Sequence, residues 1–156
     1  MSYELDLMAA IAALEKRIDR LERVENQKIV PLVQVVRVLD DLTNPRAAGT
    51  VSTITIAGAT FAVAAPYNAN YTFPAKVKGV WYSGTVVATA AQNNNGFIVQ
   101  DPDYQFNATS VAAPSTVAGH VTTGQGFTTL STAGALRISN LQPVSRLVLD
   151  IWAYLL

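Results

Sequence analysis

A heptad repeat of apolar residues near the start of the chain constrains the fold most. Ile11 and Ile18 occupy position a, and Leu7, Leu14 and Leu21 occupy position d. Apolar residues at this spacing form a narrow seam along one side of a helix, which is typical of coiled coils. A helix that packs on its own domain usually presents a wider apolar face. The pattern therefore favours association with other helices, and a single amphipathic helix packed on its own domain is the alternative.

The segment RIDRLE, residues 17–22, bears on how many helices associate. Arg17 falls at position g and Glu22 at position e of the next heptad, and these positions meet across neighbouring helices. The segment resembles the trimerisation motif of short parallel coiled coils, in which the arginine stem covers the seam and its guanidinium binds a neighbouring carboxylate. Ile at a with Leu at d favours dimers instead. We expect three chains, held together by Leu7, Ile11, Leu14, Arg17, Ile18, Leu21 and Glu22.

Pro31 interrupts this repeat. Proline cannot donate to the helical hydrogen-bond ladder, so the first helix should end near Val30. The heptad register nevertheless continues to Leu42, which favours a second short helix on the same axis that begins at the proline. The several valines of this segment favour a strand as the alternative. We predict a helical stalk over residues 1–46 and a second domain over residues 47–156.

The second domain has the pattern of an all-β fold. Short β-branched runs alternate with turn residues at intervals of roughly eight to twelve residues, which predicts an antiparallel β-sandwich and most simply a jelly roll. NNNG at 93–96 and DPD at 101–103 have the composition of turns, and the closing RLVLDIWAYLL that of a buried strand. The predicted fold class is mainly β: an N-terminal coiled coil followed by a jelly-roll-like antiparallel sandwich head, assembled as a homotrimer.

Charge is divided unevenly between the two parts. Residues 1–46 hold fifteen of the 22 charged residues, and residues 47–136 hold only Lys76, Lys78, Asp101 and Asp103. Strand edges normally carry charges that prevent aggregation, so a neutral sandwich suggests burial against copies of itself. A formal net charge of zero gives no reason to expect nucleic-acid binding. No apolar run reaches the ~18–20 residues that cross a bilayer, so we expect no membrane insertion.

Residues suited to catalysis or metal binding are scarce. His120 is the single histidine and there is no cysteine, so neither a zinc site nor a Ser-His-Asp triad is indicated. Asp101 and Asp103 have ligands for calcium in principle, but a solvated turn is the simpler interpretation. We expect no enzymatic activity, no cofactor and no metal.

The whole chain resembles a short bacteriophage tail fibre or receptor-binding protein. This resemblance rests on the coiled coil ending in RIDRLE, the proline break and the Thr/Ala/Gly/Asn-rich sandwich. It implies a virion protein whose N-terminus docks on other tail, baseplate or head proteins. It also implies that the sandwich contacts carbohydrate on the host surface. A purely structural virion component, such as a head decoration or a baseplate accessory, and a bacterial trimeric lectin-like module are the alternatives.

Carbohydrate binding would use exposed aromatic rings and amides, because sugar C–H faces stack on rings and hydroxyls pair with amides. Trp81 and Tyr82 are more simply explained as core or interface residues. The candidate binding residues lie in two polar runs: Tyr67, Asn68, Asn70 and Tyr71, and Gln92, Asn93, Asn94 and Asn95.

Overall fold

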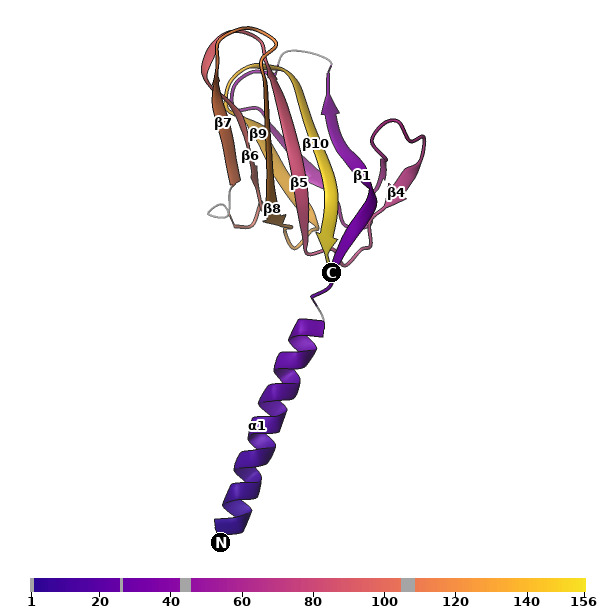
Figure 1. The fold of residues 1–156 in the computed structure, drawn as a ribbon, viewed down its shortest axis with the longest axis vertical. Helices are drawn as coiled ribbons and strands as arrows, with labels where there is room; N and C mark the ends of the chain where they lie inside the picture. Colours follow the sequence, from indigo (N-terminus) through magenta and orange to yellow (C-terminus); the bar gives the residue numbers. More distant parts are fainter. Residues whose placement is uncertain (1, 26, 43–45, 105–108) are drawn as a thin grey trace.

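A computed structural model describes residues 2–25, 27–42, 46–104 and 109–156. One helix, α1 (Ser2–Glu25), precedes a sandwich of antiparallel strands and extends away from it (Figure 1). No helix in the described part of the chain is long and apolar enough to cross a membrane. The strands are β1 (Ile29–Asp41), β2 (Val51–Thr55), β3 (Thr60–Ala62), β4 (Asn70–Thr72), β5 (Gly79–Ala88), β6 (Gln92–Gln100), β7 (Thr109–Ser115), β8 (Val121–Thr129), β9 (Ala135–Asn140) and β10 (Val144–Leu155).

The strand order confirms the predicted jelly roll. One sheet has the order β1-β10-β5-β8 and the other has the order β2-β9-β6-β7. Without the short hairpin β3–β4, the strand pairs are nested along the chain: β1 with β10, β2 with β9, β5 with β8 and β6 with β7. A single antiparallel ribbon folded over on itself produces this nesting, which is the jelly-roll arrangement.

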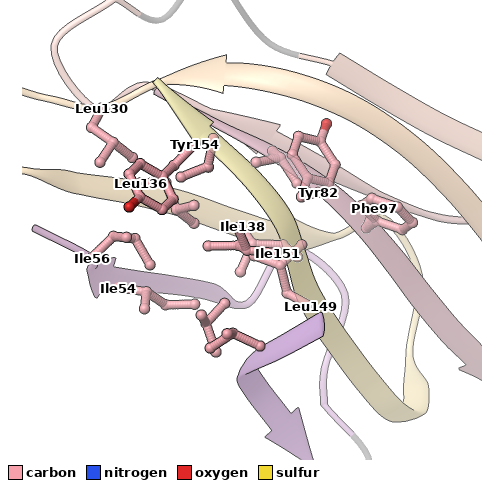
Figure 2. Close-up of a cluster of buried hydrophobic side chains, with 14 of the residues drawn as sticks. Ile54, Ile56, Tyr82, Phe97, Leu130, Leu136, Ile138, Leu149, Ile151 and Tyr154 are labelled. Carbon is pink, nitrogen blue, oxygen red and sulfur yellow. The ribbon is translucent and has the colours of Figure 1, made fainter. Parts of the chain in front are cut away.

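The core lies between the two sheets. Val36 of β1, Tyr82 of β5 and Leu149 of β10 point inward from one sheet. Phe97 of β6 and Ile138 of β9 meet them from the other (Figure 2). All five are fully buried, as expected for strands that alternate inward and outward side chains.

The segment after Pro31 is a strand, so the predicted second helix is wrong and the alternative is right. The first helix also ends at Glu25, earlier than Val30, and Val30 already belongs to β1. β1 pairs with β10 in antiparallel register from Ile29↔Leu155 to Asp41↔Leu147, with register shifts between Pro31 and Val36 and between Arg37 and Leu39, so β10 hydrogen-bonds one edge of β1. β1 is an edge strand, and an edge strand tolerates the missing N–H of Pro31. The sandwich thus begins at Ile29, within the range predicted as stalk.

One predicted turn is absent from the structure. NNNG lies within β6, where the register shifts between Gln92 and Asn95, and the chain reverses earlier, after Ala88. The predicted turn at DPD is present, since the Tyr104 N–H donates to the Asp101 carbonyl at 3.2 Å, but it is not fully solvated. Asp101 of the DPD segment is fully buried and is not a solvated turn residue. Its carboxylate accepts hydrogen bonds from the Asp103 N–H at 2.9 Å and the Thr129 hydroxyl at 2.6 Å. The closing segment is a buried strand as predicted, since β10 lies between β1 and β5.

Candidate functional site

The helix carries an apolar stripe that no other described part of the chain covers. Leu7, Ile11, Leu14 and Ile18 are about half exposed, at 53, 48, 56 and 51%. Arg17 is also exposed, whereas the side chains of Leu21 and Glu22 lie outside the described residues. Four large aliphatic side chains on one stripe are costly to leave in water, because burial stabilises each by roughly 1.5–3 kcal/mol. The stripe is therefore suited to contact with another helix.

The first predicted binding run lies on the β3–β4 hairpin beside β1. Tyr67, Asn68 and Asn70 are exposed, as a binding role requires. Tyr71 instead turns inward and donates a hydrogen bond to the Tyr154 hydroxyl at 3.0 Å. Its ring packs edge-on against Phe73 with a centroid distance of 5.1 Å. Desolvation, followed by the hydrogen bond to Tyr154, raises the pKa of Tyr71 to about 12.

A groove separates this hairpin from β1. Its volume is about 450 Å³. Gln34 and Asn70 supply amides, and Tyr71 supplies one wall. Backbone bonds hold the hairpin on β1, since Ala64 N–H donates to the Val35 carbonyl at 2.8 Å. The remaining lining residues are small or apolar: Pro31, Leu32, Val33, Val63 and Ala69. Apolar walls with a few amides fit the mixed surface of a sugar ring.

The second predicted run lies at the opposite end of the sandwich and shares no site with the first. The side chain of Gln92 is held by an internal hydrogen bond, since its amide donates to the Pro143 carbonyl at 2.6 Å. Asn95 is fully buried and donates to the Thr122 hydroxyl at 3.0 Å, so it is not available as a receptor contact. Asn93 and Asn94 remain exposed. Strict alternation would place Asn93 and Asn95 on one face, but the register of β6 against β7 shifts between Gln92 and Asn95, so only Asn95 is buried.

A second hollow, which the sequence did not indicate, lies at the end of the sandwich nearest α1. Its volume is about 430 Å³, and Lys76, Lys78 and Tyr104 line it together with Ser131 and Thr132. Apolar and small residues complete the lining: Ala57, Ala75, Val77, Leu130, Ala133 and Gly134. In the sequence, the two isolated lysines of residues 47–136 were the feature that could have indicated this hollow. Tyr104 and the turn at 131–134 are distant from them in sequence and lie beside them only in the folded chain.

Three aromatic side chains form a patch on the outer face of the sheet β1-β10-β5-β8. Trp81 contacts Phe127 at a centroid distance of 4.5 Å and Trp152 at 6.3 Å. Phe127 and Trp152 are 36 and 37% exposed. A Cβ on Gly79 would lie 2.6 Å from the Phe127 ring, so this glycine provides the space in which the ring lies. Of the two residues expected in core or interface, Tyr82 is in the core and Trp81 is on this outer face.

Charged side chains on the same outer face are paired with one another. Asp150 binds Arg37, and Asp40 binds Arg146 at 2.9 Å. The hydrogen bond from Arg146 is the main cause that lowers the pKa of Asp40. Among the described residues, no group of three or more histidines, cysteines or carboxylates is placed to hold a metal.

Comparison with known proteins gives only distant structural likenesses. No protein-family model matches the sequence, and no curated protein matches it. Among solved structures, the PRD1 vertex protein P5 is similar with a TM-score of 0.45 and 16% identity, over 78% of this chain and 73% of that one. The carbohydrate-binding module CBM6cm-2 of Cellvibrio mixtus lichenase 5A is similar with a TM-score of 0.35 and 11% identity, over 80% and 96%. Both TM-scores are below 0.5, so neither protein indicates what this chain binds.

Proposed function

We propose that the chain is a homotrimeric viral fibre protein that attaches a phage particle to carbohydrate on the host surface. In this proposal α1 forms a parallel coiled coil, and its N-terminal part docks on other tail, baseplate or head proteins. The sandwich is the receptor-binding head. The protein binds host carbohydrate and virion proteins and performs no catalysis.

The exposed stripe of α1 carries this proposal. Leu7, Ile11, Leu14 and Ile18 repeat at the coiled-coil spacing, and their own chain leaves them about half exposed. Copies of the helix would bury all four at once. The helix has 24 residues, so at ~1.5 Å per residue it is about 36 Å long and holds the heads well away from its N-terminus.

The aromatic patch supports the same assembly from the head. Trp81 and Trp152 lie where β5 begins and β10 ends, the end of the sandwich from which α1 extends (Figure 1). The Leu156 N–H donates to the Lys28 carbonyl at 3.0 Å, so a hydrogen bond joins this end of the sandwich to the segment between α1 and β1. Helices that associate would therefore bring their aromatic patches near one another. A second copy of the head is the occupant that we infer for this patch.

The groove beside β1 is the sugar site that we propose. Asn70 and Gln34 offer amides to sugar hydroxyls, while exposed Tyr67 lies on the same hairpin. Three grooves on one trimer would act together on a repetitive polysaccharide, so weak individual sites would suffice.

Disruption of the stripe tests both parts of this proposal. Ile11→Asp places a charge at position a, and Ala13→Asp places the same charge at the outward position c. Sedimentation equilibrium should give three chains for the native protein and for Ala13→Asp, and one chain for Ile11→Asp. On an immobilised glycan array, Ile11→Asp should lose most of its signal because only one groove can then bind at a time.

Each component of the proposal has its own contrary result. A native monomer or dimer at micromolar concentration would contradict the trimer. A trimer that binds no glycan on an array of bacterial surface polysaccharides would contradict the attachment role and favour a purely structural virion component.

A further inference from the structure

The hollow at the end of the sandwich near α1 combines positive charge, an aromatic ring and hydroxyl groups. Lys76 and Lys78 lie on either side of buried Val77, so both side chains leave the same short segment on its exposed side. They are the two cationic residues of the 90-residue stretch 47–136. Their ammonium groups are the positive charges that this hollow offers to an anion.

The carboxylates of Asp101 and Asp103 keep their negative charge, but backbone and hydroxyl donors hold them and neither forms an ion pair with Lys76 or Lys78. Both oxygens of Asp101 accept hydrogen bonds, from the Asp103 N–H and the Thr129 hydroxyl. One oxygen of Asp103 accepts from the Thr132 N–H at 2.7 Å and from its hydroxyl at 3.0 Å. Among the described residues, no carboxylate lies within 4.0 Å of either lysine ammonium.

The same two aspartates position the aromatic wall. Asp101 joins the end of β6 to β8 through Thr129, and Asp103 joins its loop to Thr132 in the turn before β9. The Tyr104 N–H donates to the Asp101 carbonyl at 3.2 Å. Tyr104 follows directly and is 63% exposed while lining the hollow. An exposed ring beside two cations can stack on the C–H face of a sugar whose acid group reaches the lysines.

We propose that this hollow binds a carboxylate-bearing sugar, with Tyr104 stacked on the ring and Lys76 and Lys78 paired with the carboxylate. The proposal rests on the carbohydrate-binding function above and names the class of sugar. Lysine suits this role as a mobile point charge that follows a carboxylate without requiring one fixed geometry. The Lys78 N–H donates to the Leu155 carbonyl at 2.8 Å, so the hollow lies at the end of the head from which α1 extends. A helix about 36 Å long leaves space there for a polysaccharide strand.

Matched ligands isolate the contribution of the carboxylate. Isothermal titration calorimetry on the full chain would compare trigalacturonic acid with its methyl ester, and sialyllactose with lactose. Within each pair the acid should bind at least about tenfold more tightly, because hydrogen bonds to charged groups are the stronger kind. Binding of the acids should weaken as salt rises from 50 to 500 mM, since the site is open to solvent.

Variants assign the effect to the hollow. Lys76→Gln with Lys78→Gln should abolish the preference for the acid, whereas Lys16→Gln on α1 makes the same substitution far from the site and should retain it. Tyr104→Phe should bind like the native chain and Tyr104→Ala should bind about tenfold more weakly, because the ring supplies the stacking surface. Unchanged thermal unfolding would show that the variants remain folded.

The outcomes separate this inference from the proposed function. Equal binding of acid and neutral partners, or an acid preference that survives the double lysine variant, would overturn the inference. Competition by inorganic phosphate at concentrations where acetate has no effect would overturn it in favour of a phosphate site. If neutral glycans bind and Asn70→Ala removes that binding, the groove and the attachment role remain while the inference fails.

Discussion

Arg37 and Asp150 form a two-pronged ion pair between β1 and β10, 113 residues apart in the sequence. The Arg37 Nε donates to Asp150 Oδ1 at 2.9 Å, and Nη2 donates to Oδ2 at 3.1 Å. The hydrogen bond to Asp150 is the main cause that raises the pKa of Arg37. The two residues are direct neighbours in the strand register. The ion pair therefore links the edge strand β1 to its neighbour β10.

Removal of the arginine fork should weaken β1. Arg37→Met keeps the aliphatic stem and deletes the two hydrogen bonds to Asp150 and the one to Asp40, so we expect the free energy of unfolding to fall by about 1–2 kcal/mol. Arg37→Lys should recover part of the loss, since it keeps the charge without the planar fork. Urea unfolding followed by circular dichroism measures the difference. A loss equal for the lysine and methionine variants would show that the charge alone contributes nothing, whereas full recovery by lysine would show that the planar fork contributes nothing.

Asp40 should make stability depend on acid pH. The hydrogen bond from Arg146 lowers the pKa of Asp40 from its usual 3.8, so the folded state binds the proton less readily than the unfolded state. This contribution is complete above the unfolded pKa and is lost as pH falls through the folded pKa. Asp40→Asn should therefore lower the melting temperature at pH 6 and change it less at pH 2. An identical shift at both pH values would contradict the ion pair.

Tyr71 should make the stability of the fold depend on alkaline pH. Its pKa is raised to about 12, so its stabilising effect is complete below pH 10 and is lost as pH rises from 10 to 12. Ultraviolet titration of phenolate should show one tyrosine near pH 12 that is missing in Tyr71→Phe. The variant also loses the hydrogen bond to Tyr154, which is worth about 1 kcal/mol. A Tyr71→Phe chain with an unchanged titration curve would place the late phenol elsewhere.

Gly84 should not tolerate a side chain. A Cβ there would lie 2.4 Å from the ring of Phe97, which is fully buried across the sandwich. Overpacking of a core typically costs 1–3 kcal/mol, so Gly84→Ala should unfold at clearly lower urea concentration. Gly119→Ala would be an imperfect control because its φ is +82°. Ala118→Gly, in an exposed loop, is the better one and should change stability little.

From the amino-acid pattern alone one could predict the first helix and the antiparallel sandwich after residue 47, but not the strand over 29–41. Hydrophobic spacing is a local property, so the heptads of α1 and the alternation of the strands could be read directly. The shortage of charge in residues 47–136 likewise pointed to surfaces that copies of the chain would cover. Of the polar run predicted to lie in an exposed loop, Tyr67, Asn68 and Asn70 are exposed, whereas Tyr71 is partly buried.

Residues 29–41 were compatible with a helix or a strand, and contacts with distant parts of the chain select the strand. The segment satisfies both a heptad and a strand pattern, and the partner that selects the strand is β10, at the far end of the chain. The same non-local contacts bury Asn95 against Thr122 and turn Tyr71 toward Tyr154. They also bring Tyr104 to Lys76 and Lys78. A strand is stabilised by its neighbours rather than by its own residues, so spacing along the chain specifies the element but not the side chains it meets.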